Sequence, residues 1–351
     1  MKRLIREFEE QVRAELAADG DVQIGGVKMS PLAILDPGSE TYDAEYLRWR
    51  DEEWLPSRFE RLERILDLVP DNRSRYADLK KALTRGVLVP FVGAGMSLAS
   101  GLKSWGRLLH DLRTSGTCTE AELDALLTSS PPNYEGAAEL VYQSMAHNLF
   151  LNRMSTRFQV PLANIAGPVR LLPHLFAERV FTTNFDHILE EIYLDEGLPF
   201  EFVLRGNQFL DRARQRYNRK RPSLLKLHGD ELEPGQRVFR PEEYERAYAP
   251  TSFLRRELGK AVDGTDSLLF LGCSLAADRT LTILHEAAQA DAGEPEHYAF
   301  LPYYPDEHRA RENFLADHGI YPIWYDAPTP ADHDDAIEAL LVGLLRELKK
   351  L

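Results

Sequence analysis

The segment from Val87 to Ser97 constrains the fold of this chain more than any other. It reads VLVPFVGAGMS, an apolar run that leads directly into Gly93, Ala94 and Gly95. Strands that end in glycines and continue into a helix often bind dinucleotide phosphates, because glycine lets the backbone approach the anion and the helix N-terminus offers free N–H groups. Glycine turns after strands are also common without any ligand, so this segment alone leaves both interpretations open.

Three further apolar runs end in polar motifs. Strands are predicted at residues 179–181, 224–227 and 268–271, and the motifs that follow them are Thr182-Thr183-Asn184-Phe185-Asp186, His228-Gly229-Asp230 and Gly272-Cys273-Ser274. Strands that alternate with helical patterns predict an α/β fold, with a Rossmann-like parallel sheet and helices on both faces. Because ligands of such sheets bind outside the carboxyl ends of the strands, the four motifs are expected to line one pocket.

The pattern also predicts how the chain is divided. Residues 1–82 are expected to form a mostly helical N-terminal extension, and residues 83–351 one larger domain that contains the four motifs and a helical insertion at about 102–178. Glycines and prolines predict a loop at residues 19–39. Pro90 is unusual in a central strand and is therefore expected near the end of its strand.

In this order, the motifs GAGMS, TTNFD, LHGD and GCS resemble the SIR2 superfamily, and the resemblance includes GLKSW after the first and EEYERAYA after the third. It runs from about residue 88 to residue 325. The chain resembles the bacterial SIR2-like branch rather than the deacetylases, because the run that follows GAGMS in deacetylases is missing. The two cysteines, Cys118 and Cys273, also cannot form the four-thiolate zinc site of the deacetylases. The resemblance therefore implies NAD as the substrate and no metal.

The resemblance assigns two catalytic residues. Asn184 would orient the water that attacks C1′ of the NAD+ ribose, because its amide can both accept and donate. His228 would act as a general base, since an imidazole with an ordinary pKa of about 6.5 exchanges protons near neutral pH. Outside the family context, Asn184 could instead stabilise its own loop and His228 could be a structural histidine.

Contacts with the dinucleotide are implied for Gly93, Ala94, Gly95, Ser97, Thr183, Asp186, Gly272 and Ser274. Asp186 would help to hold the nicotinamide carboxamide or, alternatively, cap the helix that follows it. The Ser274 hydroxyl would bond to a phosphate or to the adenosine ribose. Asp278 would belong to the same region or cap the next helix.

A formal net charge of −14 argues against a protein whose main task is to grip a nucleic-acid backbone. A basic strip from Arg212 to Arg221 runs against this trend, and it is either a solvated surface or a site for an acidic partner, a nucleic acid or NAD phosphates. The sequence shows neither a signal-peptide core nor an apolar run long enough to span a membrane, so a cytoplasmic location is expected.

The resulting hypothesis is a NAD+ glycohydrolase that produces nicotinamide and ADP-ribose. By resemblance, the protein would be an effector of bacterial anti-phage defence that is controlled by homo-oligomerisation or by a partner. That partner would be an ATPase or helicase-like protein, a signal sensor or an Argonaute-like protein. The alternatives are a non-catalytic sensor of NAD or ADP-ribose, and an ADP-ribosyltransferase or deacylase.

Overall fold

A computed structural model covers the 351 residues, and it describes residues 4, 7–12, 22–24, 27–29, 40–206, 221–233, 236–262, 266–276, 279–290 and 296–351. Its contacts divide the chain into two units, residues 1–63 and 64–351. None of the described helices combines the length and apolar character that crossing a membrane requires.

The described part of the smaller unit is mostly helical. It contains α2 (Glu40–Trp49), the π-helical segment η2 (Arg50–Trp54) and the start of α3 (Leu55–Leu68). Two short strands, β1 (Val22–Ile24) and β2 (Val27–Met29), pair antiparallel within the segment predicted as a loop. The loop prediction was wrong for these residues, because strands of three residues are too short to leave a periodic pattern.

The larger unit is built on a seven-stranded parallel sheet with the order β5-β6-β4-β3-β7-β8-β9. Its strands are β3 (Leu88–Val92), β4 (Arg179–Thr182), β5 (Phe202–Arg205), β6 (Ser223–Lys226), β7 (Ser267–Leu271), β8 (His297–Pro302) and β9 (Ile320–Tyr325). Apart from the edge strand β5, this is the 3-2-1-4-5-6 order of dinucleotide-binding sheets. The predicted Rossmann-like α/β class is therefore confirmed.

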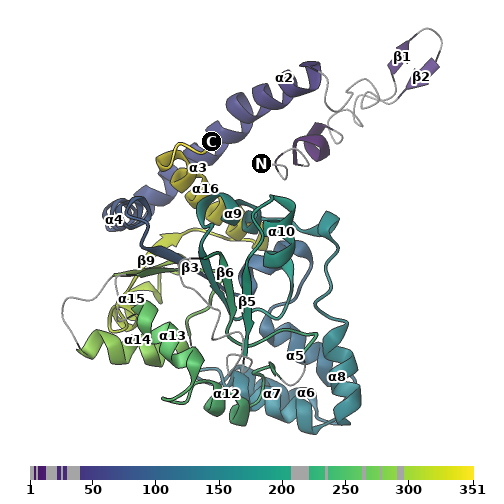
Figure 1. Ribbon diagram of the computed structural model, residues 1–351, viewed down its shortest axis with the longest axis vertical. Helices are drawn as coiled ribbons and strands as arrows, with labels where there is room; N and C mark the ends of the chain where they lie inside the picture. Colours follow the sequence, from purple (N-terminus) through teal and green to yellow (C-terminus); the bar gives the residue numbers. More distant parts are fainter. Residues whose placement is uncertain are drawn as a thin grey trace. The chain divides into compact units, whose positions relative to one another are not determined.

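Helices lie on both faces of this sheet. Figure 1 shows α4 and α16 on one side, and α13, α14 and α15 on the other. The described helices that lie wholly within the larger unit and outside the insertion are α4 (Asn72–Thr84), α10 (Ile188–Asp195), α12 (Pro241–Ala247), α13 (Phe253–Val262), α14 (Arg279–Ala290), α15 (His308–Ala316) and α16 (Pro330–Glu347). Pro250 lies between α12 and α13 and separates them, because proline cannot continue a helix.

The segment just before β3 belongs to the larger unit by its contacts. The Asn72 side chain, at the start of α4, donates to Trp324 O at 2.8 Å and accepts from Trp324 N at 3.0 Å. Residues 64–82 are thereby grouped with the sheet, whereas the sequence pattern placed them in the N-terminal extension.

Pro90 lies in the middle of β3 and not near its end as expected. Gly93 N donates to Leu271 O on β7, and donors alternate between the two sides of a strand, so the nitrogen of Pro90 faces β4. The registered pairing of β3 with β4 begins only at Phe91 and Phe181. The proline is tolerated because no ladder bond is required of it at that point.

A helical insertion between β3 and β4 has a core of its own. It contains η3 (Ala94–Ser100), α5 (Trp105–Arg113), α6 (Glu120–Leu127), α7 (Tyr134–Gln143), α8 (His147–Ser155), η4 (Leu162–Asn164), η5 (Pro168–Leu171) and α9 (Leu172–Leu175). Phe185, from the loop after β4, enters this core and stacks on Trp105 with ring centroids 5.7 Å apart. The insertion therefore anchors the loop that carries Asn184.

Candidate active site

The glycine motif packs directly against the loop that follows β7. Gly95 N donates to Gly272 O at 2.9 Å, and a Cβ added at Gly95 would lie 2.7 Å from Gly272 Cα. A Cβ at Gly93 would lie 2.6 Å from Gly272 O, and Gly272 itself has a φ of +65°. Backbone-to-backbone packing thus requires glycine at these positions. This reason for the glycines is independent of the predicted approach to a pyrophosphate.

Asn184 is buried at the end of β4, with 7% of its surface exposed. Its Nδ2 donates to Gly93 O and to Ser97 Oγ, both at 3.1 Å. Because a carbonyl oxygen can only accept, Gly93 fixes which end of the amide is the nitrogen. Asn184 Oδ1 is consequently directed elsewhere, and it is buried without a hydrogen-bond partner among the described residues.

Ser97 connects Asn184 to Asp186. The Ser97 hydroxyl donates to Asp186 Oδ2 at 2.9 Å while its oxygen accepts from Asn184. Asp186 Oδ1 accepts from Ile188 N at 3.1 Å, the contact expected of a carboxylate at the start of α10. Burial raises the pKa of Asp186, although the Lys226 ammonium opposes this effect. Three predicted site residues are therefore joined in one chain of hydrogen bonds.

The other predicted dinucleotide contacts lie around the same strand ends. Thr183 N donates to Val92 O at 3.4 Å, and Ala94 begins η3. Ser274 has an exposed side chain, and its carbonyl accepts from Arg311. Leu275, the residue after it, has a φ of 50°, which is unusual for a branched side chain and marks a constrained loop.

Two predictions lie outside the described residues. Asp278 is one, and the basic strip is the other, with the exception of Arg221 at its end. Arg221 forms an exposed ion pair with Glu201 at 2.5 Å.

His228, two residues after β6, lies against Tyr244 of α12 and against Tyr248, the residue that directly follows this helix. Its Nε2 is 2.9 Å from the Tyr248 hydroxyl, and the Tyr244 ring meets the imidazole edge to face with centroids 5.0 Å apart. These tyrosines belong to the EEYERAYA segment. The hydroxyl can donate or accept, so it is compatible with either tautomer of the imidazole.

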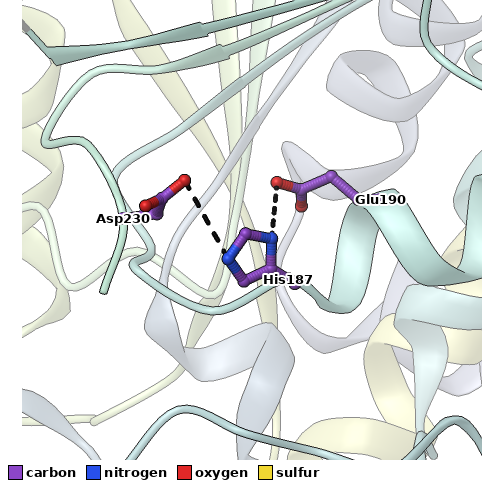
Figure 2. Close-up of side chains that lie close together, drawn as sticks. All are labelled: His187, Glu190 and Asp230. Carbon is purple, nitrogen blue, oxygen red and sulfur yellow. Dashed lines mark ion pairs between the residues drawn. The ribbon is translucent and has the colours of Figure 1, made fainter. Parts of the chain in front are cut away.

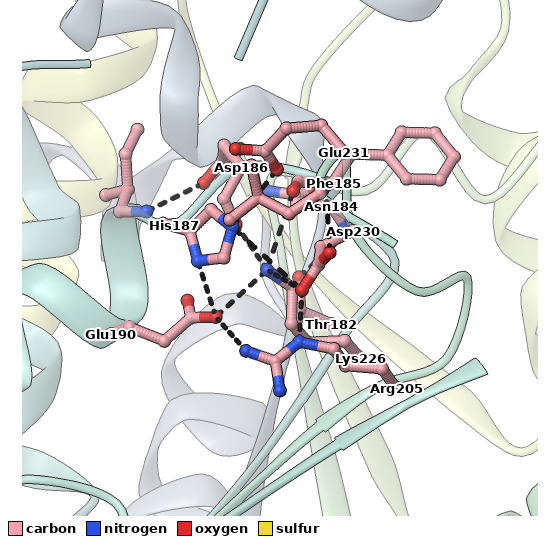
Figure 3. Close-up of polar contacts among 12 residues, drawn as sticks. Thr182, Asn184, Phe185, Asp186, His187, Glu190, Arg205, Lys226, Asp230 and Glu231 are labelled. Carbon is pink, nitrogen blue, oxygen red and sulfur yellow. Dashed lines mark hydrogen bonds and ion pairs between the residues drawn. The ribbon is translucent and has the colours of Figure 1, made fainter. Parts of the chain in front are cut away.

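Next to the Asn184 loop, ionisable side chains form a largely buried network (Figure 3). It joins the ends of β5 and β6 to the start of α10, and its members are Arg205, Lys226, His187, Glu190, Asp230 and Glu231. The Lys226 side chain has no exposed surface, and its ammonium lies 3.0 Å from Glu190 Oε1. Lys226 also donates to Asp186 O at 2.7 Å and to Phe185 O at 3.5 Å.

His187 bridges acids on two different segments (Figure 2). Its Nδ1 lies 3.2 Å from Glu190 Oε1, and its Nε2 lies 3.2 Å from Glu231 Oε2 and 3.9 Å from Asp230 Oδ2. Burial lowers the pKa of His187, but the contacts with Glu190 and Glu231 outweigh burial and raise it to about 9. Burial likewise raises the pKa of Glu190, but His187 and Lys226 outweigh it and hold that pKa at about 2.

The ligand atoms of His187, Glu190 and Asp230 lie within 4.8 Å of one another, as metal ligands would. Lys226 and Arg205 supply positive charge to the same carboxylates, since Lys226 contacts Glu190 and Arg205 pairs with Asp230. A protonated imidazole is also a poor metal ligand. The cluster is therefore interpreted as a charge-compensated ionic network and not as a metal centre.

Sequence reasoning missed Lys226, His187 and Glu190. One signal was present, because a lysine at the end of the apolar run SLLK cannot be buried without partners. Its partners come from a segment about 40 residues earlier, which no local pattern could identify.

A surface depression of about 480 Å³ lies on α12 and is lined by Glu242, Glu245, Arg246 and Ala249. None of the predicted site residues lines it. Its position gives no support to a ligand site at the strand ends.

A parallel sheet in this order, with these motifs at neighbouring strand ends, is the arrangement of a dinucleotide-binding α/β domain. A family model described as SIR2-like domain matches residues 178–323, which include TTNFD, LHGD and GCS. The resemblance predicted from the motifs is confirmed by this match.

One relative is an enzyme of known activity. The NAD(+) hydrolase ThsA of Enterococcus faecium is 26% identical to this chain over 214 residues, which cover 59% of this chain and 41% of ThsA. The chain thus aligns with less than half of the length of that relative.

Proposed function

We propose that this protein hydrolyses NAD+ at the bond between C1′ of the ribose and the nicotinamide nitrogen. In that reaction the bonding electron pair leaves with nicotinamide, and C1′ acquires oxocarbenium character. Water then attacks C1′ and loses its proton to a base, so the products are nicotinamide, ADP-ribose and one proton. The proposal is supported by the SIR2-like domain and by the similarity to a NAD(+) hydrolase.

The observation that carries the proposal is the orientation of the Asn184 amide. Its nitrogen is held by Gly93 and Ser97, whereas Oδ1 is buried and has no partner in the part of the chain that the structure describes. A buried acceptor without a partner is costly and calls for an explanation. An attacking water that donates to Oδ1 would supply the partner and would be aligned in the same step.

His228 is proposed as the general base that accepts a proton from that water or from a ribose hydroxyl. The Tyr248 hydroxyl fixes one end of the imidazole and adapts to its tautomer. The roles proposed for Gly93, Ala94, Gly95, Ser97, Thr183, Asp186, Gly272 and Ser274 are contacts with the dinucleotide. For Asp186, the hydrogen bond to Ile188 N also supports the capping alternative.

The wider biological role is proposed by analogy. A hydrolase that removes NAD+ from the cell would serve as a defence effector in the cytoplasm. Such an enzyme needs control by self-assembly or by a partner protein.

The test is chromatography of NAD+ after incubation with the purified protein, beside Asn184→Ala and His228→Ala. Release of nicotinamide and ADP-ribose by the wild type, and not by the variants, supports the proposal. Binding of NAD+ without products favours a sensor. Transfer of labelled ADP-ribose to an added protein or nucleic acid favours a transferase.

A further inference from the structure

The loops that carry Asn184 and His228 are joined by two contacts that run in opposite directions (Figure 3). Lys226, two residues before His228, donates to the carbonyls of Phe185 and Asp186, which directly follow Asn184. In return, His187, three residues after Asn184, reaches Glu231, three residues after His228. The Asn184 segment and the His228 segment are therefore joined by two separate contacts, one from Lys226 and one from His187.

Both contacts are well suited to fix a position. The Lys226 ammonium is fully buried, so its bonds to the two carbonyls are little weakened by solvent. Glu190 contacts both cations, at 3.0 Å from Lys226 Nζ and 3.2 Å from His187 Nδ1. Removal of either cation leaves buried acids with too little compensating charge.

We propose that Lys226 and His187 are positioning residues, which set the separation between Asn184 and His228 for the hydrolysis proposed above. The inference rests on that proposed function, because a fixed separation matters only if both side chains act on one substrate. A displacement of about 1 Å in such an arrangement typically lowers the rate about 100-fold.

The first experiment measures kcat and KM for NAD+ in Lys226→Met and His187→Gln. We expect kcat to fall about 10- to 100-fold, with KM within about twofold of the wild type, because the groups that contact the substrate are retained. The matched controls are Lys260→Met on α13, where the ammonium is half exposed and pairs with Glu257, and His147→Gln on α8. Unchanged kcat in folded variants, or a rise in KM alone, would overturn the proposal.

Lys226→Met removes a buried charge and could fail to fold, so Glu231→Gln provides a second variant. It keeps the shape of the side chain while weakening the contact with His187. If His187 and Glu231 act through the contact between them, His187→Gln combined with Glu231→Gln should lower kcat no further than His187→Gln alone. Losses that multiply would contradict a shared role.

A pH profile separates positioning from mere stability. Above about pH 9, His187 loses the positive charge that faces Glu190, Asp230 and Glu231, so its ion pair with Glu231 is lost and less positive charge balances these acids. The wild type should lose kcat there, and His187→Gln should lack this alkaline decline. A decline of the same shape in both proteins would exclude His187 as its source.

Amide hydrogen exchange tests the contacts independently of any activity. Residues 183–187 should exchange faster in Lys226→Met and His187→Gln than in the wild type, and at the wild-type rate in the controls. A wild type that does not hydrolyse NAD+ would refute the proposed function. Unchanged exchange rates of residues 183–187 in both variants would show that the contacts of Lys226 and His187 do not hold this loop.

Discussion

Asn184 and His228 are both buried at strand ends, but they are held in different ways. Polar partners with a fixed role orient Asn184, because Gly93 O can only accept and Ser97 is committed to Asp186. Aromatic rings and an adaptable hydroxyl surround His228. The first arrangement determines direction, whereas the second leaves the proton free to move. An orienting group and a proton-transfer group have these different requirements.

The largest effect on activity is expected from Asn184→Ala. Loss of the amide removes the only group that we propose to align the water, so nicotinamide release should fall about 100- to 1,000-fold. Asn164→Ala, an exposed asparagine in η4, is the control and should retain full activity. If Asn184→Ala keeps more than a tenth of the wild-type rate, the role proposed for Asn184 in aligning the water is wrong.

His297 offers a contrast to His228, because it is a buried histidine with a purely structural contact. Its Nδ1 accepts from Leu268 N at 3.0 Å, and burial lowers its pKa to about 4. The folded state therefore favours the neutral imidazole of His297. The contribution of this preference to stability is complete above about pH 6.5 and is lost as the pH falls toward 4. Over that window, the free energy of unfolding should decrease by about 3 kcal/mol.

Urea unfolding between pH 7 and pH 4 measures this decrease. His297→Asn, whose carbonyl oxygen can accept from the same N–H group, should show a smaller dependence on pH than the wild type. Equal slopes in the two proteins would assign the effect to other groups.

Ser97→Ala tests how much the second hydrogen bond of the Asn184 amide contributes to its orientation. Without the hydroxyl, the amide keeps only Gly93 O as its partner, so its orientation is less restricted, and kcat should fall about tenfold, equivalent to about 1.4 kcal/mol. Ser100→Ala is the matched control, since that buried serine contacts Ala166 and not the site. Steady-state kinetics would reveal a simple binding role for Ser97 as a rise in KM without loss of kcat.

The smallest effect is expected from Tyr248→Phe. The imidazole loses one hydrogen bond but keeps its aromatic surroundings, so kcat should fall only about threefold. Tyr244→Phe, which preserves the edge-to-face ring contact, should leave kcat unchanged. A 100-fold loss in Tyr248→Phe would show that His228 is held as rigidly as Asn184.

Much of the sheet could be predicted from the sequence, because buried parallel strands are continuous apolar runs that end in recognisable motifs. The edge strand β5 (Phe202–Arg205) was not predicted, since a four-residue strand of partly exposed residues lacks such a run. The position of Pro90 was wrong because it depends on which neighbour each backbone donor faces.

The candidate site was predictable only where the motifs themselves carry it. Asn184, Ser97 and Asp186 lie together because β3 and β4 are neighbours in the sheet. Lys226 and His187 acquire their partners only through the folded arrangement of β6 and α10. Charged pairs of this kind leave no periodic signal in the sequence.

The pairing of β3 with β7 has a consequence for synthesis of the protein. Val92 pairs with Leu271, and the glycine loop after β3 is hydrogen-bonded to Leu271 and to the loop after β7. The glycine loop therefore lacks these partners until about 180 further residues have been synthesised. At ordinary translation speeds this delay is roughly 10 to 40 s. A nascent chain interrupted before β7 carries every residue of GAGMS, TTNFD and LHGD, but it lacks the surface that shapes the first of them.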